Sequence, residues 1–128
     1  MISQAVPDGS LIRARGYAEV WIIKGGYRRH IISPRVFTFY RHLGFAQVID
    51  VDVGTVNQYT ESRLIRAAGD GRVYELAPNG QKRWLNMYAN QFLEVGYSPA
   101  GIYDVNAVER DFYATGSDRT PADFGIGR

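Results

Sequence analysis

The chain has 128 residues, enough for a single domain with a hydrophobic core; 45% are hydrophobic and 22% are charged, as in folded rather than disordered proteins. Cysteine is absent, which excludes disulfides, cysteine zinc sites and cysteine nucleophiles. The net charge of +2 is unevenly distributed, since residues 10–59 hold seven basic and three acidic groups and residues 61–113 hold six and seven.

Neither a membrane span nor a signal peptide is expected from the sequence. No run approaches the roughly 18 apolar residues that a membrane-spanning helix needs. Residues Met1 to Ser10 lack the positively charged start and apolar stretch of a secretory leader.

Three strands are predicted at the start of the chain. Residues 10–15 alternate between apolar and polar side chains, and residues 19–24 are rich in β-forming residues. Gly25-Gly26 favours a hairpin turn, because the primed turns need positive φ angles at their central residues. The third strand is expected at about residues 27–32.

A helix is predicted next, beginning with Ser33 as the cap and Pro34 at the first helical position. Its apolar face comprises Val36, Phe37, Tyr40 and Leu43, and Gly44 is expected to end it. A short extended segment follows, and Asp52 is expected to cap a last helix over residues 53–59.

The same order of elements is predicted for residues 61–113. Strands are expected at 63–68, 72–77 and 81–85, with Asn79-Gly80 as the hairpin turn. Asn86 is predicted to cap a helix that carries Tyr88, Phe92 and Val95 on one face and ends at Gly96. A capping box, Asn106 to Glu109, starts the last helix after a short extended segment.

These two halves also share sequence. Leu11-Ile12-Arg13-Ala14 returns 53 positions later as Leu64-Ile65-Arg66-Ala67. Further landmarks recur in the same order: Gly16 and Gly69, Val20-Trp21 and Val73-Tyr74, Arg28-Arg29 and Lys82-Arg83, Gly44-Phe45 and Gly96-Tyr97, Asp50-Val51 and Asp104-Val105.

We therefore predict an α+β fold, mainly β, made of two tandem repeats of about 50 residues. Each repeat, residues 10–60 and 61–113, is expected to hold a three-stranded antiparallel meander, a helix, a short strand and a short helix. An N-terminal arm (1–9) and an extended C-terminal tail (114–128) flank them. Units this small bury little surface, so we expect them to share a core or to pair with neighbouring copies.

The repeated pattern resembles short tandem β-rich modules of bacterial envelope and secreted proteins, which are often appended to wall-active enzymes. The resemblance covers residues 8–113. It implies a fold rather than an activity, and it supplies no catalytic residue. The second copy departs from the first where Trp84 replaces His30.

Arginine makes up all but two of the fifteen basic residues, beside nine tyrosines, six phenylalanines and two tryptophans. Such residues suit contact surfaces, and they also pack as arginines over aromatic rings within sheets. The predicted surface contacts are Arg13, Arg15, Tyr17, Arg28, Arg29, Lys82 and Arg83. Arg13 and Arg15 are expected to share a strand face that Arg28 joins, while Phe124 and Ile126 of the tail are expected to dock on a neighbour.

No catalytic constellation is found among the residues. His30 and His42 are the only candidates for a base at neutral pH, and the counterpart of His30 is a tryptophan. Asp50, Asp52 and Glu61 partly match a calcium loop whose required oxygen ligand and glycine are missing. Asp104, Glu109 and Asp111 are expected on a solvated helix face. We predict no metal, no cofactor and no enzymatic activity.

The expected function is that of a structural or attachment protein, which assembles with copies of itself or with other structural proteins in a virion or at a cell surface. One alternative is a nucleic-acid-binding protein with an arginine and aromatic surface. Another is a module that binds cell-wall polymers or glycans. A cytoplasmic location is not excluded.

Overall fold

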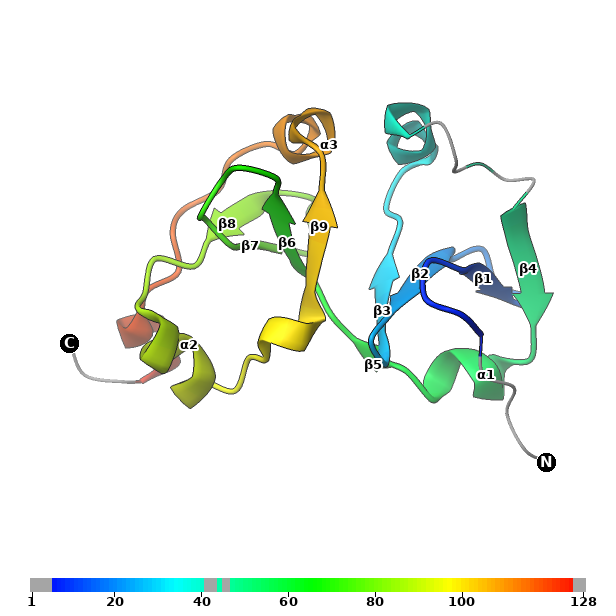
Figure 1. Cartoon of the computed structure of the whole chain (residues 1–128), viewed down its shortest axis with the longest axis horizontal. Coiled ribbons are helices and arrows are strands. Elements are labelled where there is room, and N and C mark those ends of the chain that lie inside the picture. Colours follow the sequence, from blue (N-terminus) through cyan, green and yellow to red (C-terminus); the bar gives the residue numbers. More distant parts are fainter. Residues whose placement is uncertain (1–5, 41–43, 45–46, 126–128) are drawn as a thin grey trace. The chain divides into compact units, whose positions relative to one another are not determined.

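The computed structural model describes residues 6–40, 44 and 47–125. The chain divides into two compact units, Met1–Ser62 (unit 1) and Arg63–Arg128 (unit 2), each with its own sheet (Figure 1). About 27% of the chain is helical and about 30% lies in strands of two mixed sheets. The fold is therefore of the α+β class, as predicted.

Unit 1 contains a five-stranded sheet in the order β4-β1-β2-β3-β5. Its strands are β1 (Leu11–Ala14), β2 (Trp21–Lys24), β3 (Tyr27–His30), β4 (Val48–Val51) and β5 (Thr60–Glu61). The first three form the predicted antiparallel meander, and Gly25 and Gly26 have the positive φ angles expected of its hairpin. β4 lies parallel to β1, and β5 lies parallel to β3.

Among its described residues, unit 1 also contains the short helices η1 (Pro34–Phe39) and α1 (Val53–Asn57). The Ser33 side chain accepts a hydrogen bond from the amide of Arg35, at 3.2 Å, as predicted for a cap. The helix expected to run to Leu43 is instead a six-residue 3-10 helix, because Tyr40 is extended and the valine, threonine and aromatic residues before it are weak helix formers. Leu43 lies outside the described residues.

Unit 2 contains a four-stranded sheet in the order β8-β7-β6-β9. Its strands are β6 (Leu64–Ala67), β7 (Tyr74–Leu76), β8 (Lys82–Trp84) and β9 (Ile102–Val105). β6, β7 and β8 are antiparallel, and β9 is parallel to β6. Leu64 to Ala67 pair one by one with Ile102 to Val105, as Leu11 to Ala14 pair with Val48 to Val51.

Before the tail, the described helices of unit 2 are α2 (Ala89–Glu94), η3 (Pro99–Gly101) and α3 (Ala107–Phe112). Asn106 caps α3 as predicted, since its side chain accepts the amide of Glu109 at 2.8 Å. The prediction that Asn86 caps α2 is wrong, because α2 begins after Tyr88. Asn86 is held by the tail instead, and its amide donates to the carbonyl of Arg119 at 2.8 Å.

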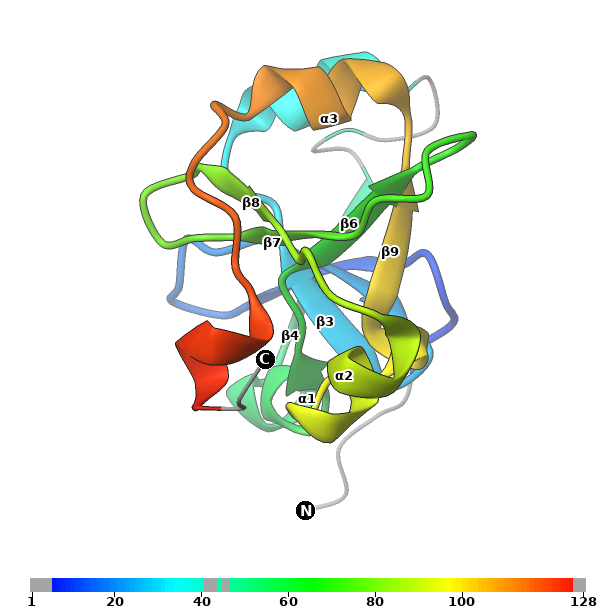
Figure 2. The ribbon, with the colours of Figure 1, turned by 90° about the vertical axis from the view of Figure 1, so that its left-hand side faces the viewer.

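The sheet of unit 2 is covered on both faces, by α3 on one side and α2 on the other (Figures 1 and 2). One core lies under α3 and consists of Ile65, Ala67, Tyr74, Leu76, Val105 and Tyr113. The other lies under α2 and consists of Leu64, Leu85, Phe92 and Ile102. In unit 1 the core beside α1 consists of Ile12, Ala14, Ile23, Val51 and Val56.

The tail folds back onto unit 2. It runs beside β8, with isolated parallel bridges from Thr115 to Lys82 and from Arg119 to Leu85, and ends in η4 (Pro121–Phe124) (Figure 2). The predicted extended course is correct up to Arg119. A neighbouring molecule is not needed to hold this segment, because β8 of the same unit supplies its backbone partners.

Candidate functional site

Basic side chains of both predicted pairs, Arg28-Arg29 and Lys82-Arg83, pack into their own units. The Arg28 guanidinium lies 4.7 Å from the centre of the Trp21 ring and donates to the carbonyl of Val56, near the end of α1, at 2.7 Å. In unit 2, Lys82 lies 5.8 Å from the Tyr74 ring, and its ammonium donates to the carbonyl of Tyr113, at the end of α3, at 2.7 Å. A cation at these carbonyls complements the negative end of a helix.

The side chains of Arg29 and Lys82 are only 4% and 7% exposed. The prediction that they lie at the surface is therefore wrong. The long aliphatic part of each side chain packs as an apolar group would, so a basic residue on a strand does not by itself indicate a contact surface. The alternative arrangement, basic side chains over aromatic rings, is present in both units.

Arg13 and Arg15 do point outward from β1, but each faces a carboxylate. Arg13 is 3.0 Å from Asp50, and Arg15 pairs with Asp52. Arg28 does not join them, because it aligns with Ile23 on the opposite face of the sheet. In unit 2, Arg83 donates to the backbone oxygen of Ser117 at 2.9 Å and so holds the tail.

Two aromatic residues of the predicted contact set have different surroundings. Tyr17 is 57% exposed on the loop after β1. Phe124 packs within its own unit, edge-on to Tyr97 at 5.8 Å between ring centres and 4.1 Å from the guanidinium of Arg119. Ile126, the other tail residue predicted to dock, lies outside the described residues.

The side chains considered for catalysis or metal binding do not converge. His30 packs against Trp21, and His42 lies outside the described residues. Glu109, expected on a solvated face, is completely buried and accepts a hydrogen bond from the Tyr113 hydroxyl at 2.6 Å. Within the described ranges, no three histidine or acidic side chains are placed to hold a metal ion.

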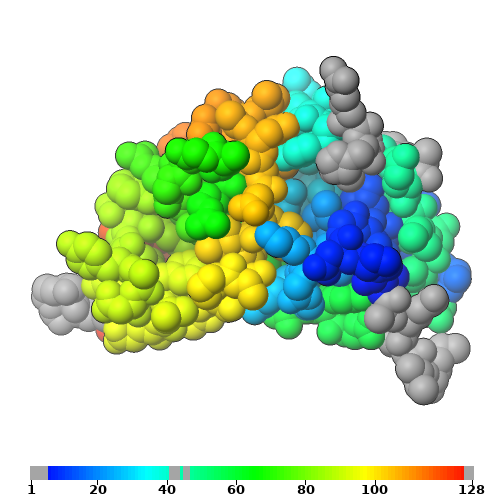
Figure 3. Space-filling view, viewed as in Figure 1, coloured from blue at the N-terminus to red at the C-terminus, as the bar shows by residue number. Residues whose placement is uncertain are grey.

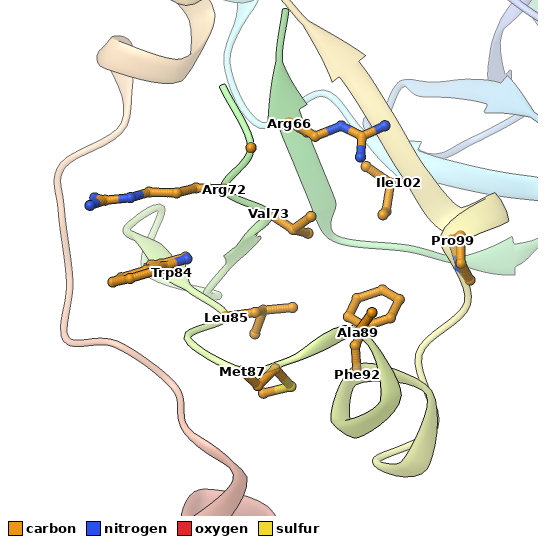
Figure 4. A pocket seen from close by; sticks show the side chains of 11 residues that line it. Arg66, Arg72, Val73, Trp84, Leu85, Met87, Ala89, Phe92, Pro99 and Ile102 are labelled. Carbon is orange, nitrogen blue, oxygen red and sulfur yellow. The ribbon is translucent and has the colours of Figure 1, made fainter. Parts of the chain in front are cut away.

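Unit 2 contains a pocket of about 520 Å³. It opens between the segment that links β6 to β7 and the segment that holds α2 (Figure 3). Figure 4 shows its apolar interior and its polar rim. The interior consists of Val73, Leu85, Met87, Phe92, Pro99 and Ile102, and the rim consists of Arg66, Arg72 and Trp84.

The two rim arginines differ in their partners. Arg66 lies 3.8 Å from Asp104, its partner in the register of the neighbouring strand, as Asp50 is the register partner of Arg13. The Arg72 guanidinium lies 4.2 Å from the centre of the Trp84 ring, and the two side chains extend side by side from the rim (Figure 4). The backbone amide of Arg72 donates to the Asp70 carboxylate at 3.0 Å, whereas in the part of the chain that the structure describes the Arg72 guanidinium has no carboxylate partner.

A smaller pocket of about 280 Å³ occupies the corresponding place in unit 1. Residues 18–20 stand where unit 2 has residues 71–73, and Ile31 and Phe37 provide apolar walls. Its polar residues are Glu19 and His30, where unit 2 has Arg72 and Trp84. The two pockets thus share a position and differ in charge.

The sequence analysis missed the pocket and Arg72. The repeat contains the one available indication, since Glu19 and Arg72 are corresponding positions of opposite charge. No helix in the described portion is long and apolar enough to cross a membrane. Comparisons with protein-family models, with curated proteins and with solved structures find no match to this chain.

Proposed function

We propose that the chain is a non-catalytic binding protein whose unit 2 pocket takes a short protein segment carrying an apolar side chain beside a carboxylate. Such binding would attach or join proteins in an assembly, in a virion or at a cell surface. The observation that carries this proposal is the apolar pocket with Arg72 at its rim.

The interior of the pocket favours an apolar side chain. Its volume of about 520 Å³ lies within the usual range of small-ligand sites, and its walls are mainly aliphatic and aromatic. A single leucine, methionine or aromatic side chain would remove its own surface and that of Phe92 and Met87 from water. Burial of apolar surface contributes roughly 25 cal/mol per Å².

The rim favours a carboxylate on the same segment. Stacking on Trp84 orients the Arg72 guanidinium and leaves its donor edges open to an incoming ligand. Arginine binds carboxylates through two parallel hydrogen bonds, and such charge-assisted bonds are about twice as strong as neutral ones.

The nucleic-acid alternative loses support from the same side chains. Arg28 and Lys82 bind backbone carbonyls inside their units, and Arg13 and Arg15 face carboxylates. A protein that binds along a phosphate backbone needs free cationic side chains, which displace the counterions condensed on the nucleic acid. The glycan alternative rests on the resemblance to envelope modules, whereas sugar rings stack on open aromatic platforms and one face of Trp84 is covered by Arg72.

We further propose that the two units are tandem repeats. Their sheets share the β1-β2-β3 and β6-β7-β8 meanders, and the same Leu-Ile-Arg-Ala strand pairs in the same register with a parallel strand. The cation that bridges a ring and a helix end also recurs at Arg28 and Lys82. One unit can then keep the fold while the other specialises its pocket.

The test is an NMR titration of ¹⁵N-labelled protein with the peptide acetyl-Gly-Leu-Ala-Glu-Gly-amide, in which the indole N–H resonance of Trp84 reports binding. We expect saturable shifts at Trp84, Arg72 and Met87 and none at Trp21. In the peptide with lysine in place of glutamate, or in the variant Arg72→Gln, binding should weaken about tenfold or more, because a hydrogen bond to a charged group contributes about 1.5–3 kcal/mol.

Arg13→Gln serves as the matched control, since it removes the same charge from an exposed arginine outside the pocket. Its affinity for the peptide should equal that of the unaltered protein. Equal affinity for both peptides, or shifts spread over unit 1, would contradict the proposal. Salt-sensitive binding of an oligothymidylate, or retention on purified cell-wall polymer, without any peptide binding would favour one of the two alternatives instead.

A further inference from the structure

We propose that the segment bound by the unit 2 pocket comes from a second copy of this chain. The donor is the loop of residues 16–19 in unit 1, with the Tyr17 ring entering the apolar interior and the Glu19 carboxylate binding Arg72. This inference rests on the proposed function and names its partner.

The donor loop presents the required chemistry to solvent. Tyr17 is 57% exposed, more than any other described large hydrophobic residue except Tyr88 and Val108. Gly16 has a φ angle of +86°, and the amide of Tyr17 donates to the carbonyl of Ala14 at 3.0 Å, so a tight turn carries the ring. Glu19 is also exposed, and no described residue pairs with it.

The spacing within the loop suits the pocket. Residues two apart in an extended segment are separated by about 6.6 Å along the chain. On the receiving side, Arg72 and Val73 are neighbours in the chain and both line the pocket, with the Arg72 side chain at the rim (Figure 4). A tyrosine ring has an apolar body and a polar tip, which fits an apolar interior that opens toward Arg66.

The corresponding loop of unit 2 cannot act as a donor. Asp70 stands in the place of Tyr17, and Arg72 stands in the place of Glu19. The smaller unit 1 pocket in turn has Glu19 at the position of Arg72 and therefore lacks the cation that a carboxylate needs. Donor and receiver are thus different surfaces, which makes the contact heterologous; such contacts close into rings or extend into filaments.

A single loop buries far less than a standard interface, so the association is of the weak and transient class unless further surface joins it. Sedimentation of the full chain should be measured at protein concentrations from about 10 μM to about 1 mM, since the dissociation constants of such contacts fall in that range. The variants are Arg72→Glu, Glu19→Arg and Tyr17→Ala. Each should weaken self-association about tenfold or more, because each removes a charge-assisted pair or the buried ring.

Mixing the variants distinguishes this contact from a symmetric dimer. Arg72→Glu retains an intact donor loop, and Tyr17→Ala retains an intact pocket, so each alone should remain monomeric. Their equimolar mixture should form a one-to-one complex and nothing larger, since neither chain has both surfaces. The double variant Arg72→Glu/Glu19→Arg should associate with itself again, because the reversed charges once more attract.

A mixture that stays monomeric, or single variants that associate like the unaltered chain, would overturn the inference. The peptide titration separates this failure from that of the proposed function. A chain that stays monomeric near 1 mM but binds the Leu-Ala-Glu peptide through Arg72 retains the function and needs another partner. A chain that stays monomeric near 1 mM and also fails to bind the peptide contradicts both proposals.

Discussion

At the scale of single residues, the fold strongly alters the ionisation of Tyr97. Its hydroxyl donates to one oxygen of Glu75 at 2.7 Å, and Arg119 donates to the other at 2.6 Å. Burial and the hydrogen bond to the Glu75 carboxylate raise the pKa of Tyr97 well above its usual value of 10.0. Tyr97 therefore stays protonated in the folded protein under conditions where an unfolded chain loses that proton.

A pH dependence follows from this shift. The stabilisation linked to Tyr97 is complete below pH 10 and declines above it, because the unfolded state then releases its proton while the folded state retains it. We expect urea denaturation between about pH 9 and pH 11 to show a steeper loss of stability for the unaltered protein than for Tyr97→Phe. Equal slopes for the two proteins would disprove the link.

At the scale of elements, the caps of the two last helices offer a comparison within one chain. Asn106 accepts the Glu109 amide at 2.8 Å, whereas Asp52 occupies the same position before α1 and makes no such bond. Asn106→Ala should cost about 1 kcal/mol. Asp52→Ala should cost less than about 0.5 kcal/mol, because its ion pair with Arg15 is exposed to solvent.

Chemical denaturation of the two variants measures this difference. Both variants truncate the residue before a helix to alanine, but Asn106→Ala removes a capping bond and Asp52→Ala removes only an exposed ion pair. A loss for Asp52→Ala as large as that for Asn106→Ala would mean that the bond to Glu109 contributes little to the stability of α3.

The tail is fastened mainly by Arg119. This residue contacts Glu75 and the Phe124 ring, and its amide and carbonyl bond to Trp84 and Asn86 of the adjoining segment. Arg119→Ala should lower the free energy of unfolding by about 2 kcal/mol, since a partly buried hydrogen bond to a charged group is lost. The exposed pair of Arg13 with Asp50 provides the control, and Arg13→Ala should cost less than about 1 kcal/mol.

The elements were predictable to different degrees. Alternating side chains and glycine turns located β1, β2 and β3 and their counterparts, because these patterns are local. The start of α2 was not predictable, since the tail takes Asn86 from outside the local sequence. The burial of Glu109 follows from a contact with Tyr113 four residues on, a spacing that faces one side of a helix and could have been noticed.

The pocket was beyond sequence reasoning. Its lining comes from residues 66 to 102 on the strands β6, β8 and β9, the helices α2 and η3 and the segments between them, and concavity depends on how these elements pack. Arg72 belongs to no motif, and only its place beside Trp84 in the folded unit gives it a role. The predicted contact residues were chosen by type and strand position, which does not distinguish an inward cation from an outward one.

At the scale of the whole molecule, each unit has its own core and its own tryptophan. Ile12 and Ile65 are completely buried at corresponding positions of β1 and β6. Substitution of either by alanine should cost about 2–5 kcal/mol. With Trp84→Phe as background, fluorescence follows Trp21 alone; with Trp21→Phe, it follows Trp84.

We expect Ile12→Ala to lower the denaturant midpoint of the unfolding transition reported by Trp21 more than that of the transition reported by Trp84. Ile65→Ala should do the opposite. Equal shifts of both reporters by each substitution would mean that the chain unfolds as one cooperative unit.

The return of the tail to β8 also determines the order in which the protein can mature on the ribosome. Every strand of the unit 1 sheet precedes Ser62. The unit 2 sheet, in contrast, is complete only after β9 has been made, and the outer edge of β8 is paired only after Arg119. At about 5–20 residues per second, several seconds of synthesis separate these two points. During that interval unit 1 can fold while β8 still has an open edge, and a nascent chain that stops before Arg119 leaves that edge available for pairing with other chains.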